Sequence, residues 1–239
     1  MIELPTTRIK AESKSPKKLL IYSAPKVGKT TAGAMLDNNL TLDFENGAGF
    51  VDSMRVNIPD MATLEEVVKA VIAANKPYRY GTVDTTTRLE EMVLPYAAKL
   101  YKQTPMGANF KGDNVLTLPN GAGYLYLREA YTKTTAIIDS LFERTIYFGH
   151  LKDKVLEKNG KEVSAKDIDL TGKIRNIACA NADAIGYLYR EGNKTIVSFV
   201  TTQDIICGAR PEHLRNQEIV LLEEIDGKLV SHWDKIYID

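Results

Sequence analysis

The stretch KLLIYSAPKVGKTT, residues 18–31, decides the fold. Its apolar run, Leu19–Tyr22, predicts a short buried strand. The loop that follows ends in Gly28-Lys29-Thr30, which matches the last positions of the phosphate-binding pattern G-x-x-x-x-G-K-S/T. Ser23 stands where that pattern has its first glycine. The stretch therefore predicts a strand, a phosphate-binding loop (P-loop) and the start of a helix. The alternative is a lysine-rich turn in an ordinary α/β domain.

The residue types of this loop suit a nucleoside triphosphate. Backbone N–H groups of such a loop and of the helix N-terminus bind phosphate oxygens, and Gly28 allows the close approach. Lys29 supplies a cation to the terminal phosphates, and the Thr30 hydroxyl is a ligand for Mg²⁺. The predicted nucleotide-binding residues are Ser23, Ala24, Pro25, Lys26, Val27, Gly28, Lys29, Thr30 and Thr31.

Length and composition predict one soluble globular domain. The 239 residues are 44% hydrophobic and 26% charged, with a formal net charge of zero. A net charge of zero gives no support for nucleic-acid binding by the protein as a whole, but it does not exclude a local basic surface. Cys179 and Cys207 lack metal-binding spacing and are expected to be reduced thiols. With neither a membrane-spanning apolar run nor a signal-peptide pattern, we expect a cytoplasmic protein.

Two acids follow predicted strands. Glu45 comes directly after the strand 40–44, and Asp84 ends the strand 78–84. Ligands of open α/β sheets bind at the carboxyl ends of the strands, so both acids are expected beside the P-loop. Glu45 is a candidate to orient the attacking water, and Asp84 is a candidate Mg²⁺ ligand in the Walker B role. The alternatives are a solvated turn for Glu45 and a helix-capping role for Asp84.

Two further residues are candidates for reading phosphate. His150 ends the predicted strand 145–150 and could sense the terminal phosphate, although a lone histidine is more often structural. Arg210 lies in the loop 207–214 and could reach phosphate in its own subunit or in a neighbour's. The alternative for Arg210 is a surface ion pair.

Apolar spacing and capping residues predict the remaining elements. A capping box at Thr63 and Glu66 opens one helix, and a second at Thr87 and Glu90 opens another that kinks at Pro95. An edge strand is expected at 7–10, and further helices at 29–36, 124–142 and 176–183. The chain then changes to a β pattern, with strands expected at 184–190, 195–200, 218–222 and 228–230.

Two polar segments are candidate nucleic-acid contacts. Residues 103–123 are rich in Gly, Asn and Pro, and the basic and aromatic side chains in and beside them suit single strands. These side chains are Lys102, Phe110, Lys111 and Tyr124. Residues 152–172 are lysine-rich and predict a projecting hairpin with an Asn159-Gly160 turn. The alternatives are an ordinary mobile insertion and a solvated charged face.

The order of these features over residues 17–215 resembles the RecA-like core ATPases carried by bacteriophages. It is most similar to small phage ATP-binding proteins linked to recombination and single-strand annealing. The element Glu45-Asn-Gly47 is the most telling, because RecA-like ATPases carry their catalytic glutamate after this strand. The resemblance implies a RecA-like α/β fold, a mostly parallel sheet flanked by helices with a β-rich C-terminal extension.

The same resemblance implies a role for each candidate. Glu45 would be the general base, Asp84 the Walker B acid and His150 the polar switch that reads the γ-phosphate. Residues 152–172 would match the mobile loop that contacts DNA. Arg210 would match a basic residue that reaches the neighbouring subunit's nucleotide.

We therefore expect a Mg²⁺-dependent ATPase that binds DNA, single-stranded as the resemblance implies, in phage recombination or replication. Its cofactors would be ATP and Mg²⁺. Its partners would be single-stranded DNA, a single-strand-binding protein and further copies of itself, in the host cytoplasm and without a membrane. One domain, 1–239, would comprise a lead-in (1–16), a nucleotide-binding core (17–183) and a β-rich part (184–239). The alternatives are an annealing or loading scaffold with negligible hydrolysis and a P-loop small-molecule kinase.

Overall fold

The computed structural model describes residues 4–158, 161–202 and 204–239. Within them, one 11-stranded sheet has the order β11-β10-β8-β7-β1-β5-β4-β2-β3, with β6 paired to β5 and β9 paired to β7. The strands are β1 (Lys18–Ser23), β2 (Asn39–Asp43), β3 (Arg55–Asn57), β4 (Tyr80–Asp84), β5 (Arg144–Lys158), β6 (Lys161–Ile168), β7 (Ala184–Glu191), β8 (Lys194–Ser198), β9 (Gly208–Ala209), β10 (Glu218–Ile225) and β11 (Lys228–Ser231).

The half of the sheet from β7 to β3 is parallel throughout. Its register pairs Ser23 with His150 and Asp43 with Asp84. Parallel strands joined through helices all end at the same edge, so the residues that follow β1, β2 and β4 meet there. The strand ends predicted from the sequence therefore converge on one edge of the sheet.

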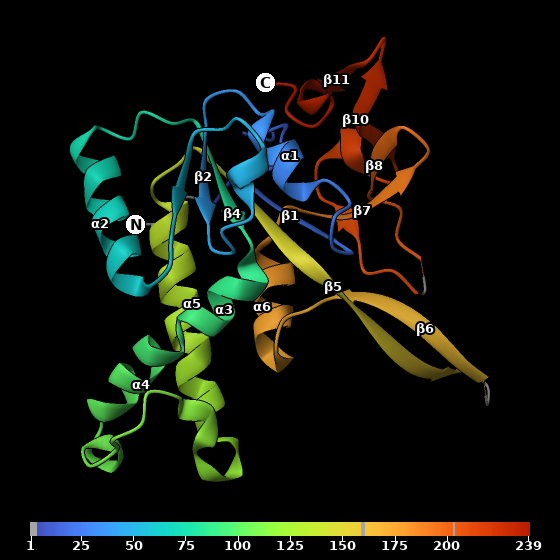
Figure 1. Ribbon diagram of the computed structural model, residues 1–239. Coiled ribbons are helices and arrows are strands. Elements are labelled where there is room, and N and C mark those ends of the chain that lie inside the picture. Colours follow the sequence, from blue (N-terminus) through green and yellow to red (C-terminus); the bar gives the residue numbers. More distant parts are fainter. Residues whose placement is uncertain (1–3, 159–160, 203) are drawn as a thin grey trace.

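Helices cover both faces of this parallel half (Figure 1). They are α1 (Lys29–Ala34), α2 (Met61–Ala73), α3 (Thr86–Met92), α4 (Leu94–Lys102), α5 (Gly123–Asp139) and α6 (Gly172–Asn181). Short 3₁₀ turns lie at Ala48–Phe50, Pro105–Gly107, Val115–Thr117, Pro119–Gly121, Glu212–Leu214 and Trp233–Lys235. One apolar core contains side chains of α2 to α6, and the other contains α1 and the C-terminal strands. No helix in the described ranges has both the length and the apolar character to cross a bilayer.

The C-terminal part is β-rich, as predicted. Strands β7, β8, β10 and β11 form an antiparallel series that extends the parallel sheet. This series packs against the P-loop and α1: the buried Trp233 Nε1 donates a 2.8 Å hydrogen bond to the carbonyl of Ala32. The expected architecture is confirmed: a mostly parallel sheet with helices on both faces and a β-rich C-terminal extension.

The predicted projecting hairpin is confirmed in its strands. β5 and β6 pair in antiparallel fashion from Leu151↔Ile168 outward, and Figure 1 shows them extending away from the body. The predicted Asn159-Gly160 turn lies outside the described residues, and so do the side chains of Lys154, Lys158 and Lys161. The expectation that the strand ends at His150 is wrong, because β5 leaves the sheet and continues to Lys158 as one arm of the hairpin.

The starts of two helices, predicted from capping boxes in the sequence, were placed too late in the chain. Asp60 caps α2, where its carboxylate accepts the backbone N–H of Thr63 at 2.8 Å. Thr85 caps α3 in the same manner, through the N–H of Arg88. Both predicted capping boxes therefore lie inside their helices, because short polar side chains occur at several candidate positions. Residues 7–10 form no strand.

Gly81 on β4 allows a close contact that explains its presence in a buried strand. A Cβ placed on Gly81 would lie 2.1 Å from a ring carbon of Phe142. The ring therefore occupies the space that a side chain would need, and it covers β4 where the sequence lacks a large aliphatic residue.

We predict that Gly81→Ala lowers the free energy of unfolding by about 1–3 kcal/mol, because the Phe142 ring has to move. Denaturant titration measures this. Gly49→Ala is the control, since a Cβ there meets no atom within 4 Å, and its effect should stay within about 0.5 kcal/mol. Equal stability of the two variants would contradict the packing explanation.

Candidate functional site

The P-loop connects β1 to α1 and is stabilised by its neighbours. Gly28 is the N-cap of α1 and has a left-handed φ of 117°, a conformation that glycine adopts readily. Thr195 on β8 approaches the loop, with Oγ1 3.4 Å from the Val27 carbonyl. A side chain on Gly28 would be strained by its φ and would also contact Thr195 and Leu222. Glycine at this position therefore lets the loop turn sharply beneath the C-terminal strands.

Lys29 is a buried cation with only neutral hydrogen-bond acceptors. Its side chain points back into the loop, where Nζ donates to Ser23 Oγ at 2.9 Å and to the carbonyl of Ala24 at 3.3 Å. Lys29 is 6% exposed, and burial lowers its pKa while Asp84 and Glu45 oppose that shift. Within the described part of the chain, Lys29 forms no ion pair. A buried ammonium of this kind is suited to an anionic ligand.

Thr30 and Asp84 meet between α1 and β4. The Thr30 hydroxyl donates to Asp84 Oδ2 at 2.7 Å. Burial raises the pKa of Asp84 to about 6; the hydrogen bond from Thr30 opposes this shift, while Glu45 and Asp43 reinforce it.

These two oxygen ligands fit Mg²⁺. This ion binds proteins through one or two oxygen side chains and takes its other ligands from phosphate and water. The described residues contain no cluster of three metal-ligating His, Cys, Asp or Glu side chains.

Glu45 is held at the same edge by two side-chain hydrogen bonds. Its Oε1 accepts the hydroxyl of Thr85 at 2.6 Å and lies 2.6 Å from His150 Nε2. Because an ionised carboxylate has no proton to give, Nε2 is the donor in the second bond. The His150 backbone N–H in turn donates to Thr87 Oγ1 at 3.0 Å. The carboxylate is therefore connected to both α3 and the base of the β5–β6 hairpin.

Asp43 organises the loop that carries Glu45, and sequence reasoning missed it. The buried Asp43 carboxylate accepts the backbone N–H groups of Glu45, Gly47 and Ala48 at 3.0–3.2 Å. An Asp followed closely by Asn-Gly is the sequence signal for such a turn. Thr85 and Thr87 were also missed as site contacts, because their position relative to Glu45 and His150 depends on the sheet register.

Arg210 is not brought to this site. Its guanidinium pairs with Asp183 at 3.2 Å and donates to the Ala180 carbonyl at 2.7 Å. Asp183 accepts the backbone N–H groups of Lys17 and Lys18, at the first end of β1. The P-loop begins at the opposite end of this six-residue strand, about 17 Å away. The expectation that Arg210 reaches phosphate in its own subunit is therefore wrong, since the sheet places the two at opposite edges.

We predict that Asp84→Asn stabilises the metal-free protein at pH 8 by about 3 kcal/mol. Because folding raises the pKa of Asp84, the protonated form is favoured in the folded state. The stabilising effect of that proton is complete below the unfolded pKa near 4 and is lost as the pH rises through about 6. Unfolding titrations with a chelator measure this, and Asn retains an acceptor for Thr30. A stability difference that is the same at pH 4 and pH 8 would contradict the prediction.

Comparisons with known proteins bear on this site. A KaiC-like protein from the hyperthermophilic archaeon Pyrococcus horikoshii is 13% identical, over 90% of this chain and 89% of its own, with a TM-score of 0.42. The RadB recombinase is 9% identical, over 91% of this chain and 92% of its own, with a TM-score of 0.46. No curated protein sequence matches the chain. The family described as AAA domain (AAA_24) matches residues 15–211, which include the P-loop, Glu45, Asp84 and His150. The chain therefore belongs to this family of AAA domains.

Proposed function

We propose that the protein binds ATP and hydrolyses it with Mg²⁺, and that residues 1–239 act as one domain around the continuous sheet. The observation that carries this proposal is the buried Lys29, whose ammonium faces only the neutral oxygens of its own loop. When phosphate enters the loop, Lys29 exchanges these acceptors for anionic oxygens, and charged partners strengthen its hydrogen bonds. Binding of ATP thus compensates a buried charge to which the loop itself offers neutral oxygens.

Thr30 and Asp84 would hold Mg²⁺, which neutralises charge on the transferring phosphoryl group when bound. Glu45 is the proposed base, because it follows β2 at the same edge and has a carboxylate to accept a proton from water. Thr85 and His150 hold Glu45 Oε1 and thereby orient the carboxylate. His150 is the proposed sensor, since a shift of its ring changes a direct bond to Glu45.

We predict that Lys29→Ala reduces ATP turnover at least about 100-fold, because removing one stabilising charge costs about 2.7–4 kcal/mol of activation energy. Lys228→Ala is the control, since Lys228 is an exposed lysine at the first position of β11 and lies outside the loop. Glu45→Gln should bind a fluorescent ATP analogue normally but turn over slowly. Normal turnover in Lys29→Ala would overturn the site, and normal turnover in Glu45→Gln would remove Glu45 as the base.

We further propose that the substrate of this ATPase cycle is single-stranded DNA, bound in a groove between α5 and α6. The groove has a volume of about 670 Å³. Its lining includes Gly121 and Ala122 just before α5, and Thr171–Ile174 at the start of α6. Helix N-termini carry partial positive charge and free N–H groups, so both ends suit phosphate.

The side chains of this groove are basic and aromatic. Arg128 and Lys173 supply its charges, and its lining contains no acidic residue. Tyr101, Tyr124 and Tyr126 supply aromatic surface, and the Tyr101 and Tyr126 rings lie 5.0 Å apart. Bases of single strands stack on such rings while basic side chains follow the backbone. This combination supports the proposal despite a net charge of zero.

We predict that Arg128→Ala with Lys173→Ala weakens binding of a fluorescent oligothymidylate about 10-fold or more and makes the salt dependence shallower, because two phosphate contacts are lost. Lys69→Ala with Lys99→Ala is the control, since these lysines line a different groove, between α2 and α4. Fluorescence anisotropy over a series of salt concentrations measures both quantities. Equal affinity losses in the two double variants would argue against the α5–α6 groove.

One observation favours the alternative of an ATP-dependent annealing or loading scaffold with negligible hydrolysis. Thr85 and His150 both bond to the same oxygen of Glu45, which restrains the proposed base. DNA binding that depends on ATP but is accompanied by no ATP turnover would select this alternative. In either case we propose a role in phage recombination or replication. We also propose that the protein assembles with further copies of itself, so that Arg210 reaches a neighbouring subunit's nucleotide. A single-strand-binding protein is the proposed partner. The sequence resemblance supports these points.

A further inference from the structure

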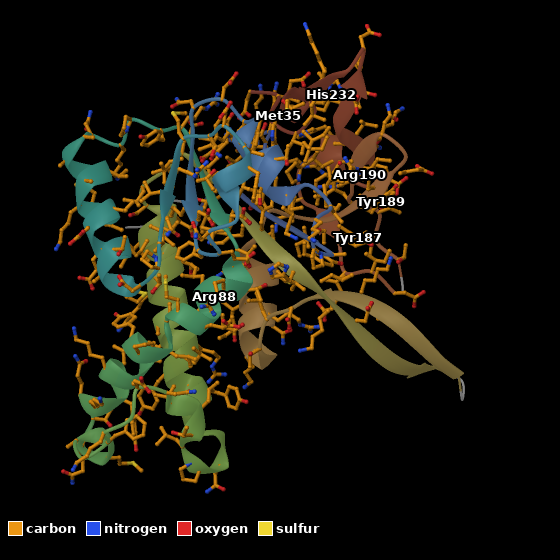
Figure 2. The ribbon with its side chains drawn as sticks, in the orientation of Figure 1. Met35, Arg88, Tyr187, Tyr189, Arg190 and His232 are labelled. Atoms are coloured by element: carbon orange, nitrogen blue, oxygen red, sulfur yellow. The ribbon has the colours of Figure 1, made fainter. Side chains whose placement is uncertain are left out.

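Helix α3 follows β4 at the P-loop edge of the sheet and lies against α5, whose first residues line the proposed DNA groove (Figure 1). It begins two residues after Asp84, so its start is fixed by the end of β4. Arg88, labelled in Figure 2, lies on the exposed side of α3. The opposite side of α3 carries three polar residues, Thr86, Thr87 and Glu90, that bond to other elements.

Glu90 joins α3 to the start of α6. It is 6% exposed, and its two carboxylate oxygens accept the backbone N–H of Thr171 at 2.9 and 3.2 Å. Thr171 is the N-cap residue of α6 and lines the proposed DNA groove. Burial raises the pKa of Glu90, and the hydrogen bonds from Thr171 oppose that shift. The Glu90 carboxylate therefore occupies the positive end of a ten-residue helix.

The other two residues join α3 to the remaining parts of the site and the groove. Thr87 Oγ1 accepts the backbone N–H of His150, whose ring contacts Glu45. Thr86 Oγ1 lies 2.6 Å from the hydroxyl of the fully buried Tyr131 on α5. A movement of α6 relative to α3 can therefore be transmitted through these hydrogen bonds to the carboxylate of Glu45, the proposed base.

We propose that Glu90 is a positioning residue that couples occupancy of the α5–α6 groove to the ATP site. This inference rests on the proposed function. A DNA phosphate that binds at the start of α6 competes with Glu90 for the same positive helix end, because both are anions. The Glu90–Thr171 contact then shifts, α3 shifts with it, and Thr87 transmits the change to His150 and Glu45. By thermodynamic reciprocity, nucleotide binding changes DNA affinity by the same factor.

The test measures this coupling factor directly. The affinity of a fluorescent oligothymidylate is determined with and without a non-hydrolysable ATP analogue, and the ratio of the two dissociation constants is the factor. Wild type is expected to give a ratio of about 5 or more, and Glu90→Ala a ratio within about 2-fold of 1. Glu90→Gln, which keeps an acceptor for the Thr171 N–H, should restore most of the coupling. Glu91→Ala, an exposed neighbour on α3, should leave the ratio unchanged.

A second variant protects the test against misfolding of Glu90→Ala. Thr171→Pro removes the N–H that Glu90 accepts, and the native φ of −75° suits proline. It should also abolish the coupling, while basal ATP turnover and analogue affinity stay within about 2-fold of wild type in Glu90→Ala.

Two results in the variants overturn the inference alone: a coupling ratio equal to that of the wild type in both, or a parallel loss of analogue binding, which would indicate a merely structural role. Failure of the wild-type protein to bind the oligonucleotide would overturn the DNA part of the proposed function, and the coupling with it. If the wild-type protein binds both ligands but its two dissociation constants for the oligonucleotide are equal, the proposed function stands and the coupling is ruled out.

Discussion

The position of β1 between β5 and β7 is the constraint on which the rest of the structure depends. Leu19, Ile21 and Tyr22 are fully buried, because parallel neighbours and helices cover both sides of this strand. A strand buried in this way cannot shift its register by one residue without exchanging its two apolar faces. The loop after Ser23 is therefore held at a fixed edge, and α1 starts in a fixed direction.

The candidate site places charge where the fold would be more stable without it. Lys29 and Asp84 are 6% and 3% exposed. Burial lowers the pKa of Lys29 and raises the pKa of Asp84, so in each case it favours the neutral form. Buried charges without a close partner destabilise a protein. The ATP and Mg²⁺ that we propose as ligands would supply both signs at once at this edge of the sheet.

The contacts around Glu45 differ in kind from those of the P-loop. Lys29 and Thr30 belong to one short segment and would be present in any protein with this loop. Glu45 follows β2, Thr85 follows β4 and His150 lies within β5, so the three residues meet only through the sheet register. His150 also lies on β5, which continues into the β5–β6 hairpin, so the hairpin is connected to Glu45 through a single hydrogen bond.

The sequence by itself determined the features that depend on local pattern: the P-loop, the strand before it, the acids after β2 and β4, the hairpin strands and the β-rich C-terminal part. Apolar periodicity and short motifs report these features directly, since they depend on residues close in the chain. Only the tertiary structure decided which strand ends meet. It brought Thr85 and Thr87 to the site, took Arg210 to the opposite edge of the sheet, and buried Glu90 against the start of α6. These contacts join residues up to 81 positions apart, and their geometry follows from strand order and register, which no local pattern encodes.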